Sequence, residues 1–347
     1  MASKLARIAL ASLACLALPF ATDASMLRST SERAAPIQDP GYQALVNAAN
    51  AVVGVKVKAL PNARSNETLG DERTGSGIVI RDDGLVLTIG YLIMEADQVE
   101  ITDSSGTKLP ATVVAYDHAT GFGLLKPLGR LSTKPIKLGT SAPVSQMDRL
   151  MIVTGGGEQT VSIATVVSKR QFAGYWEYLI KDAIFTAPPR LDHSGAALIN
   201  KDGELVGVGS LFVMDALTPG EKLPGNMFVP VDLLKPVLDE MVRTGEQTAS
   251  RRPWIGVNSL EENGRVTVMH VNEESPADKA GVSAGDIILS VNGEPVESLE
   301  KFYGTLWRPG SQPGSEVRLT LLHGVSLKEV TVRSIDRREF MRQKPGI

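Results

Sequence analysis

The chain has 347 residues, of which 43% are hydrophobic and 22% are charged, and its formal net charge is −3. This length predicts two or three domains, and the composition is that of an ordinary globular protein. Lysines and arginines are scattered without a dense basic run, so we expect no nucleic-acid partner.

The first 24 residues have the layout of a secretory signal peptide. Lys4 and Arg7 precede an apolar run over residues 8–21, and small residues follow it. The run is too short for a comfortable membrane span, although an uncleaved anchor is the alternative. No second apolar run of spanning length follows. We therefore expect a mature chain without a membrane span, periplasmic or secreted.

Cys15 is the only cysteine, and it lies inside the predicted signal. The mature chain is therefore expected to have no disulfide and no thiol chemistry. A lipoprotein signal that uses Cys15 is the alternative, but Ser12 stands where such signals usually carry a leucine.

After a polar linker over residues 25–40, helical spacing of apolar residues predicts a helix over 42–51. Many short apolar runs separated by turn residues then predict an all-β barrel or sandwich. A helix over 231–242 is expected to close this region, and a polar linker follows at 244–252. The predicted strands are 51–57, 77–80, 85–88, 99–101, 111–114, 150–153 and 161–167.

A second, α+β domain is predicted over residues 253–335. It alternates short apolar runs with two stretches of helical character. Its predicted strands are 254–257, 266–271, 287–291 and 317–322, and its predicted helices lie near 277–280 and 299–307.

Residues 191–198, LDHSGAAL, look like the nucleophile loop of a trypsin-like serine protease, with Ser194 at the nucleophile position. Residues 74–80 and 84–88 resemble the opening hairpin of the HtrA (Deg) family of exported trypsin-like proteases, and residues 226–231 resemble that family's last strand. The resemblance implies a mainly β fold, a trypsin-like double β-barrel over residues 41–245.

Within this resemblance, the other two catalytic positions carry residues that cannot do the chemistry. Tyr91 stands in the place of the histidine base, and Gly121 stands in the place of the aspartate. A serine hydroxyl is a poor nucleophile unless a neighbouring base takes its proton. A phenol is neutral near pH 7 and accepts a proton poorly, and Gly121 has no side chain to orient a base. Losing this relay costs on the order of 10⁴ to 10⁶ in turnover.

The nucleophile loop also departs from the family pattern around the serine. Asp192 replaces the glycine two residues before the nucleophile, His193 replaces an asparagine, and Ala196 replaces the second following glycine. We expect the Asp192 carboxylate beside the oxyanion hole, where its charge would repel the developing oxyanion.

A rearranged base is the alternative to an inactive site. None of the four histidines precedes residue 118, so the usual order of histidine, aspartate and serine cannot be rebuilt. His193, Lys126 and Lys181 are the candidate unusual bases. His118 and His193 also suggest a metal site, but two histidines without a matched carboxylate are weak evidence. We expect no cofactor and no metal.

Residues 275–282 and 285–296 resemble a bacterial PDZ domain strongly. Most of this motif is structural, since its glycines serve turns and its apolar residues supply the core. The resemblance implies that the mature chain is a protease-fold domain followed by one PDZ domain.

The predicted peptide-binding residues of this domain lie on two segments. Trp254, Ile255, Gly256 and Val257 stand where PDZ domains carry the loop whose backbone N–H groups cradle a C-terminal carboxylate. Packing between domains is the alternative role of Trp254. The other wall of the groove is predicted to include Phe302 and Leu306, with burial in the core as the alternative.

Together these features predict an exported HtrA-like pseudoprotease that binds peptides or unfolded segments, as a chaperone-like or adaptor protein of the cell envelope. An active serine endopeptidase with a rearranged base is one alternative, and a metal-binding or assembly scaffold is another. Proteins of this family are often trimers joined through the N-terminal part of the protease domain, so Tyr42 is a candidate interface residue.

Overall fold

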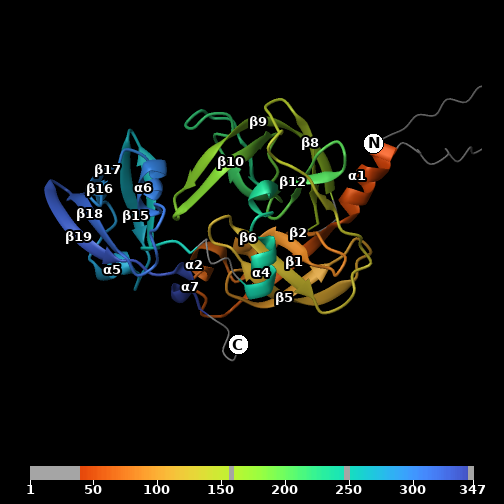
Figure 1. The fold of residues 1–347 in the computed structure, drawn as a ribbon, viewed down its shortest axis with the longest axis horizontal. Helices are drawn as coiled ribbons and strands as arrows, with labels where there is room; N and C mark the ends of the chain where they lie inside the picture. Colours follow the sequence, from red (N-terminus) through yellow and green to blue (C-terminus); the bar gives the residue numbers. More distant parts are fainter. Residues whose placement is uncertain (1–39, 156–159, 246–250, 343–347) are drawn as a thin grey trace, which may run out of the picture. The chain divides into compact units, whose positions relative to one another are not determined.

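The computed structural model describes residues 40–155, 160–245 and 251–342 (Figure 1). The predicted signal peptide and most of the predicted linker lie outside the described residues. The predicted helix over 42–51 is confirmed as α1 (Pro40–Asn50), which starts at a proline, the residue whose missing N–H costs nothing at the first helical position. Within the described ranges, no helix is both long enough and apolar enough to cross a membrane.

Six antiparallel strands form the first barrel, in the order β1-β2-β3-β6-β5-β4. Two short helices, α2 (Asn66–Leu69) and α3 (Gly90–Ile93), interrupt them, and α3 directly follows β3. The strands are β1 (Val52–Ala59), β2 (Glu72–Val79), β3 (Val86–Ile89), β4 (Ala96–Thr102), β5 (Lys108–Tyr116) and β6 (Phe122–Pro127).

A second sheet follows in the order β11-β8-β9-β10-β13-β12-β7, and β11 also pairs with β12, which closes it into another barrel. The longest strand, β9, forms a hairpin with β10, and the tip of this hairpin lies at residues 175–177. The strands are β7 (Lys137–Leu138), β8 (Arg149–Thr154), β9 (Thr160–Gly174), β10 (Tyr178–Ala187), β11 (Ala197–Ile199), β12 (Glu204–Val213) and β13 (Gly225–Pro230).

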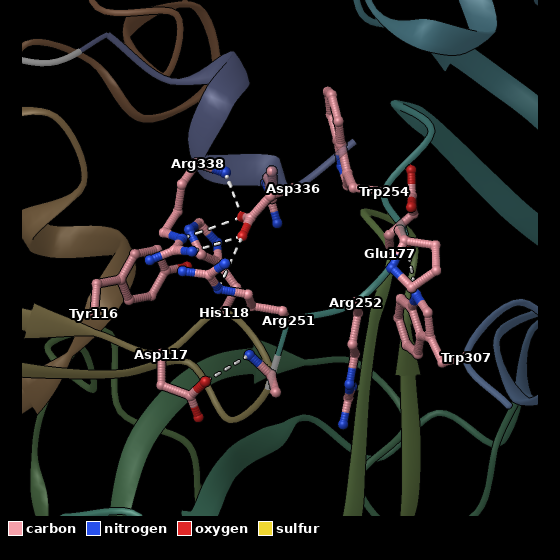
Figure 2. Close-up of a pocket in the computed structure, with 13 residues that line it drawn as sticks. Tyr116, Asp117, His118, Glu177, Arg251, Arg252, Trp254, Trp307, Asp336 and Arg338 are labelled. Atoms are coloured by element: carbon pink, nitrogen blue, oxygen red, sulfur yellow. Dashed lines mark hydrogen bonds and ion pairs between the residues drawn. The ribbon is translucent and has the colours of Figure 1, made fainter. Parts of the chain in front are cut away.

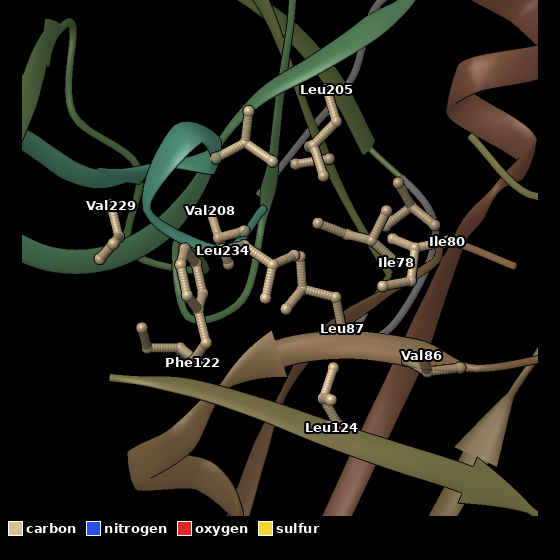
Figure 3. Close-up of a cluster of buried hydrophobic side chains, with 14 of the residues drawn as sticks. Ile78, Ile80, Val86, Leu87, Phe122, Leu124, Leu205, Val208, Val229 and Leu234 are labelled. Carbon is tan, nitrogen blue, oxygen red and sulfur yellow. The ribbon is translucent and has the colours of Figure 1, made fainter. Parts of the chain in front are cut away.

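One hydrophobic core draws residues from both barrels, as Figure 3 shows for Ile78, Leu87, Phe122 and Val208. All four are 0% exposed. Full burial of such a side chain contributes roughly 1.5–3 kcal/mol. The strands of both barrels therefore pack on one shared, closely packed core.

The predicted continuous helix over 231–242 is wrong. The chain instead forms η1 (Val231–Leu233) and then α4 (Leu238–Thr244). Pro236 lies between them, and proline lacks the N–H donor and clashes with the preceding turn of a helix. α4 ends at Gly245 in the left-handed conformation, a common helix ending.

The third region is an antiparallel sheet in the order β14-β15-β16-β18-β19, with β17 paired to β16. Its core includes Val266, Phe302 and Leu319. The strands are β14 (Val257–Glu262), β15 (Arg265–Val271), β16 (Ile287–Val291), β17 (Glu294–Pro295), β18 (Glu316–His323) and β19 (Ser326–Arg333); the helices are α5 (Pro276–Lys279), α6 (Leu299–Leu306) and α7 (Arg337–Phe340).

The strand predicted over 254–257 begins only at its last residue. Gly256 has φ +90°, which turns the chain immediately before β14, so residues 254–256 form a loop. Trp254 makes only an isolated bridge to Ile335.

Candidate functional site

Ser194 lies on the loop between β10 and β11, and backbone hydrogen bonds hold this loop against β2 and β12. The Ser76 N–H donates to the Ser194 carbonyl oxygen (2.8 Å), and the Gly195 N–H donates to the Gly209 oxygen (2.9 Å). Gly195 has φ +74°, and a Cβ there would collide with the Ser76 oxygen, so only glycine fits. The serine is therefore presented by a well-fixed loop.

Tyr91, on α3, lies directly against this serine. Its hydroxyl oxygen is 2.7 Å from Ser194 Oγ and 2.8 Å from the Ser210 carbonyl oxygen. A carbonyl only accepts, so the phenol donates its proton to Ser210 and accepts the Ser194 hydroxyl proton. The structure thus brings two of the three predicted catalytic positions together.

Burial raises the pKa of Tyr91 to about 12, with the hydrogen bond to Ser194 opposing this only in part. At pH 7 only about 10⁻⁵ of such a phenol is ionised. The neutral phenol that remains is a very weak proton acceptor. Tyr91 therefore satisfies the Ser194 hydroxyl without activating it.

Gly121 adopts φ +80°, and a Cβ built on it would lie 2.8 Å from the Tyr178 hydroxyl. That hydroxyl donates to the Thr120 carbonyl oxygen (2.7 Å), so Tyr178 fills the space beside the glycine. The nearest carboxylate in the sequence, Asp117, accepts the Thr120 N–H (3.1 Å) and closes a local turn. No carboxylate at this position orients a base.

The Asp192 carboxylate does not stand as a free charge, which corrects the expected repulsion of an oxyanion. Arg190 donates to it through Nε (2.9 Å) and Nη2 (2.6 Å), and Thr154 Oγ1 adds a third bond (2.8 Å). Burial alone would raise the pKa of Asp192, but the hydrogen bonds from Arg190 and Thr154 outweigh it and lower the pKa. The charge is largely compensated by Arg190.

The candidate unusual bases make contacts elsewhere. Lys126 Nζ pairs with the Asp83 carboxylate (3.3 Å), and Lys181 is exposed on β10. His193 Nδ1 lies 3.1 Å from the Arg190 carbonyl oxygen, and burial lowers its pKa. Burial also lowers the pKa of His118, well below its usual value.

The alternative hypothesis of a metal site is not supported by the described part of the chain. No group of three or more His, Cys, Asp or Glu side chains is arranged there to hold an ion. His118 instead packs against Tyr116, with ring centroids 4.2 Å apart.

The predicted carboxylate-binding loop already holds a carboxylate from this chain. Glu177, at the tip of the β9–β10 hairpin, accepts N–H groups from Ile255 (3.2 Å), Gly256 (2.7 Å) and Val257 (3.0 Å). Figure 2 shows this side chain beside Trp254. Sequence reasoning missed Glu177 because a single acidic residue at a hairpin tip carries no distinguishing signal.

The other predicted peptide-binding residues are buried. Trp254 is 5% exposed, and its ring lies 4.6 Å from that of Phe340. Phe302 and Leu306 belong to the core of the PDZ-like sheet. On α6 it is Tyr303 that reaches the hairpin, through its hydroxyl.

A cavity of ≈ 560 Å³ links the region of the serine to the loop region. Tyr91, His193 and Ser210 line it from the barrels, and Trp254 and His270 line it from the third region. A smaller cavity of ≈ 40 Å³, drawn in Figure 2, adjoins Glu177.

Comparison with known proteins supports both halves of this architecture. The model of the trypsin-like peptidase domain matches residues 75–208, and the model of the PDZ domain matches residues 253–333. The chain combines these two domains as HtrA/DegP-family proteases do.

Curated HtrA-type relatives match over most of this chain. Serine endoprotease DegS of Haemophilus influenzae is 28% identical over 301 residues, covering 82% of this chain and 84% of the relative. A probable periplasmic serine endoprotease DegP-like of Pseudomonas putida is 28% identical over 268 residues, covering 72% of this chain. The chain spans 53% of that DegP-like relative and 51% of one from Chlamydia pneumoniae, about half their length.

Solved HtrA-type structures share the fold. The HtrA-type protease AlgW with decapeptide aligns with a TM-score of 0.52 at 20% identity, covering 88% of this chain and 99% of that one. The serine endoprotease from Yersinia pestis aligns with a TM-score of 0.51 at 24% identity, covering 85% and 97%.

Proposed function

We propose that this chain is an HtrA-like pseudoprotease, in which the trypsin-like domain is retained as a scaffold and the PDZ domain binds peptides. The observation that carries the proposal is the 2.7 Å contact between the Tyr91 hydroxyl and Ser194 Oγ. The group that faces the serine is therefore a phenol rather than an imidazole.

The chemistry of acyl transfer explains why this contact matters. As Ser194 Oγ bonds to a substrate carbonyl carbon, its proton must move to a base, which then carries a positive charge. A protonated phenol is far too acidic to hold that proton, and Gly121 supplies no carboxylate to stabilise the cation. We expect a loss on the order of 10⁴ to 10⁶ in turnover relative to an intact triad.

Peptide capture is the activity we assign to residues 253–335, with residues 41–245 as the protease-fold scaffold. PDZ domains bind a free C-terminal carboxylate through backbone N–H groups, and here Ile255, Gly256 and Val257 direct theirs to one carboxylate. Peptides or unfolded segments are the proposed ligands, bound in a chaperone-like or adaptor role.

We place this activity in the periplasm, after removal of the predicted signal over residues 1–24. The DegP-like relatives are named periplasmic serine endoproteases, which supports this location. A homotrimer joined near α1 is proposed as the assembly, where Tyr42 is 51% exposed.

Labelling with a fluorophosphonate probe tests the inactive serine. Because the probe reacts only with an activated serine, we expect the wild type to label no more than Ser194→Ala. Labelling of the wild type at the level of an active trypsin-like protease would overturn the proposal.

An active serine endopeptidase is the second candidate. Two observations favour it: Ser194 is retained on a well-fixed loop, and the curated relatives are named serine endoproteases. This candidate requires a base from outside the usual triad, and labelling that persists in Tyr91→Phe but is lost in Ser194→Ala would support it.

A further inference from the structure

The tip of the β9–β10 hairpin lies in the groove where a PDZ domain binds its peptide. The groove is bounded by the loop at residues 254–256, by strand β14 and by helix α6. Residues 174–177 of the hairpin make hydrogen bonds to all three of these walls.

The first wall supplies three N–H groups to the Glu177 carboxylate. Oε1 accepts from Gly256 and Val257, and Oε2 accepts from Ile255. Glu177 is 5% exposed, so these bonds replace its hydration. This is the hydrogen-bond pattern that a C-terminal carboxylate makes with such a loop.

The loop is held in place by the domain itself. The Ala277 N–H donates to the Ile255 oxygen (2.8 Å), and Asn272 donates to the Gly256 oxygen through both its backbone N–H (3.0 Å) and Nδ2 (2.9 Å). The carbonyls of the loop are thus satisfied from behind, and its N–H groups face the groove. Glu177 occupies a prepared anion site rather than creating one.

The second wall makes one main-chain hydrogen bond to the turn at the hairpin tip. The Ser259 N–H donates to the Tyr175 carbonyl oxygen (2.8 Å). Ser259 lies two residues after Val257, and Tyr175 lies two residues before Glu177. The two contacts therefore follow each other in antiparallel order along β14, with the carboxylate at the loop end, which is the order in which a peptide ligand contacts such a strand.

The third wall contacts the hairpin through one side chain. The Tyr303 hydroxyl donates to the Gly174 oxygen (2.7 Å) and accepts the Glu177 N–H (3.1 Å). Ala173 and Leu179, on either side of the tip, pack against the PDZ core. The contacts thus combine main-chain hydrogen bonds, a captured carboxylate and apolar anchors.

We infer that residues 174–177 are an internal ligand of the PDZ domain, and that the external partner is a protein C-terminus whose α-carboxylate displaces Glu177 from the N–H groups of residues 255–257. This inference rests on the proposed peptide-binding function. The inference adds that the external peptide competes with the hairpin tip. The apparent affinity for the peptide is therefore the intrinsic affinity multiplied by the fraction of molecules whose groove is free.

The barrel responds to this displacement because Glu177 adjoins Tyr178. Tyr178 is the side chain that fills the space beside Gly121 and bonds to Thr120. Trp176 stacks on it, with centroids 5.3 Å apart and an interplanar angle of 16°. Release of the hairpin tip therefore alters the packing around Trp176.

Tryptophan emission reports on this region because all three tryptophans of the chain surround the contact. Trp176 lies at the hairpin tip, Trp254 is the first residue of the loop, and Trp307 stacks on Tyr303 with ring centroids 4.9 Å apart. Tryptophan emission therefore measures whether the hairpin tip is bound to the PDZ domain, and no peptide has to be added for this measurement.

The test compares the full mature chain as wild type, Glu177→Ala and Glu177→Gln, with Glu221→Ala as the control because Glu221 is an exposed glutamate of the same barrel. Binding of a fluorescein-labelled octapeptide with a free C-terminal valine is measured at pH 7, beside its C-terminal amide. We expect Glu177→Ala to bind the free acid at least about tenfold more tightly than wild type, and Glu177→Gln, whose amide oxygen still accepts N–H groups, to bind it less tightly than Glu177→Ala. The tryptophan emission of Glu177→Ala should shift to the red relative to wild type as Trp176 becomes hydrated.

The two readouts separate the two claims. Equal emission and equal affinity in Glu177→Ala, wild type and Glu221→Ala would overturn the internal ligand while leaving peptide capture standing. A red shift in Glu177→Ala without any preference for the free acid over the amide would support the bound hairpin tip and overturn peptide capture.

Discussion

The hydroxyl of Tyr178 occupies the space into which any side chain at Gly121 would project. A Cβ at Gly121 would lie 2.8 Å from this oxygen, closer than real Cβ contacts. The phenol is in turn held by the Thr120 carbonyl at 2.7 Å. At Gly121, which we propose corresponds to the aspartate of the triad, the space for a side chain is therefore filled by Tyr178.

Introducing a histidine and an aspartate at the two proposed triad positions is consequently expected to give no activity. Tyr91→His with Gly121→Asp should show no casein cleavage above Ser194→Ala, because the new carboxylate collides with Tyr178. The substitution at φ +80° should also lower the free energy of unfolding by about 1–3 kcal/mol, measured by urea denaturation.

Gly106→Asp is the matched control for this experiment, because Gly106 has φ +83° with open space where its Cβ would lie. It carries the same backbone cost without the collision. If Gly121→Asp is no more destabilising than Gly106→Asp, the refilled space is not an obstacle.

Removing the Tyr91 hydroxyl should destabilise the protein. In Tyr91→Phe the Ser210 carbonyl loses its donor and the Ser194 hydroxyl loses its acceptor, which costs about 1–3 kcal/mol in the free energy of unfolding. Tyr42→Phe on the exposed face of α1 should be close to neutral. Equal denaturation midpoints for both variants would show that the hydrogen bonds of Tyr91 contribute nothing.

The carboxylate loop depends on glycine at position 256. Gly256 has φ +90°, and a Cβ there would meet the Ser275 side chain, so Gly256→Ala should weaken peptide binding more than about tenfold. Gly264→Ala, at φ +71° in open space, is the control within the same domain. Peptide affinity that falls equally in both variants would indicate a general loss of stability instead.

Peptide affinity should also depend on pH through Glu177. Burial raises the pKa of Glu177 to about 7 from an ordinary value of 4.5, despite three opposing backbone hydrogen bonds. Between about pH 4.5 and pH 7, Glu177 is therefore more often protonated in the bound hairpin tip than in the released tip. Lowering the pH through this window favours the bound tip. Affinity for a free-acid peptide should rise roughly tenfold or more from pH 5 to pH 7 and then level off.

Tyr303 and His118, two buried groups near Glu177, are not expected to produce this profile. Burial raises the pKa of Tyr303 far above this range and lowers the pKa of His118 well below its usual value. The remaining charged groups of the adjoining cavity are Asp117, Arg251, Arg252, Asp336, Arg337 and Arg338. Glu177→Gln should give a flat profile over pH 5–7, and an unchanged profile in that variant would assign the titration to another group.

Much of the architecture could be predicted from the sequence because short apolar runs and turn residues determine β-strands locally. Runs such as 85–88 and 266–271 correspond closely to β3 and β15. The prediction of one helix over 231–242 was wrong because Pro236 interrupts the helix despite the helical spacing of the apolar residues.

The chemistry of the site depended on contacts that no local pattern contains. The neighbouring motifs predict which catalytic positions Tyr91 and Gly121 occupy. They do not predict that the Tyr178 side chain fills the space beside Gly121. Glu177 and Val257 are 80 residues apart, and nothing in either segment indicates that they meet. The pairing of Asp192 with Arg190 likewise changed the expected electrostatics of the nucleophile loop.

Casein digestion by purified wild-type protein beside Ser194→Ala tests the central claim most directly. We expect both proteins to digest casein only at the background rate, because the hydroxyl of Ser194 faces the neutral phenol of Tyr91. Casein cleavage by the wild type that disappears in Ser194→Ala would contradict it and establish an active endopeptidase with a rearranged base.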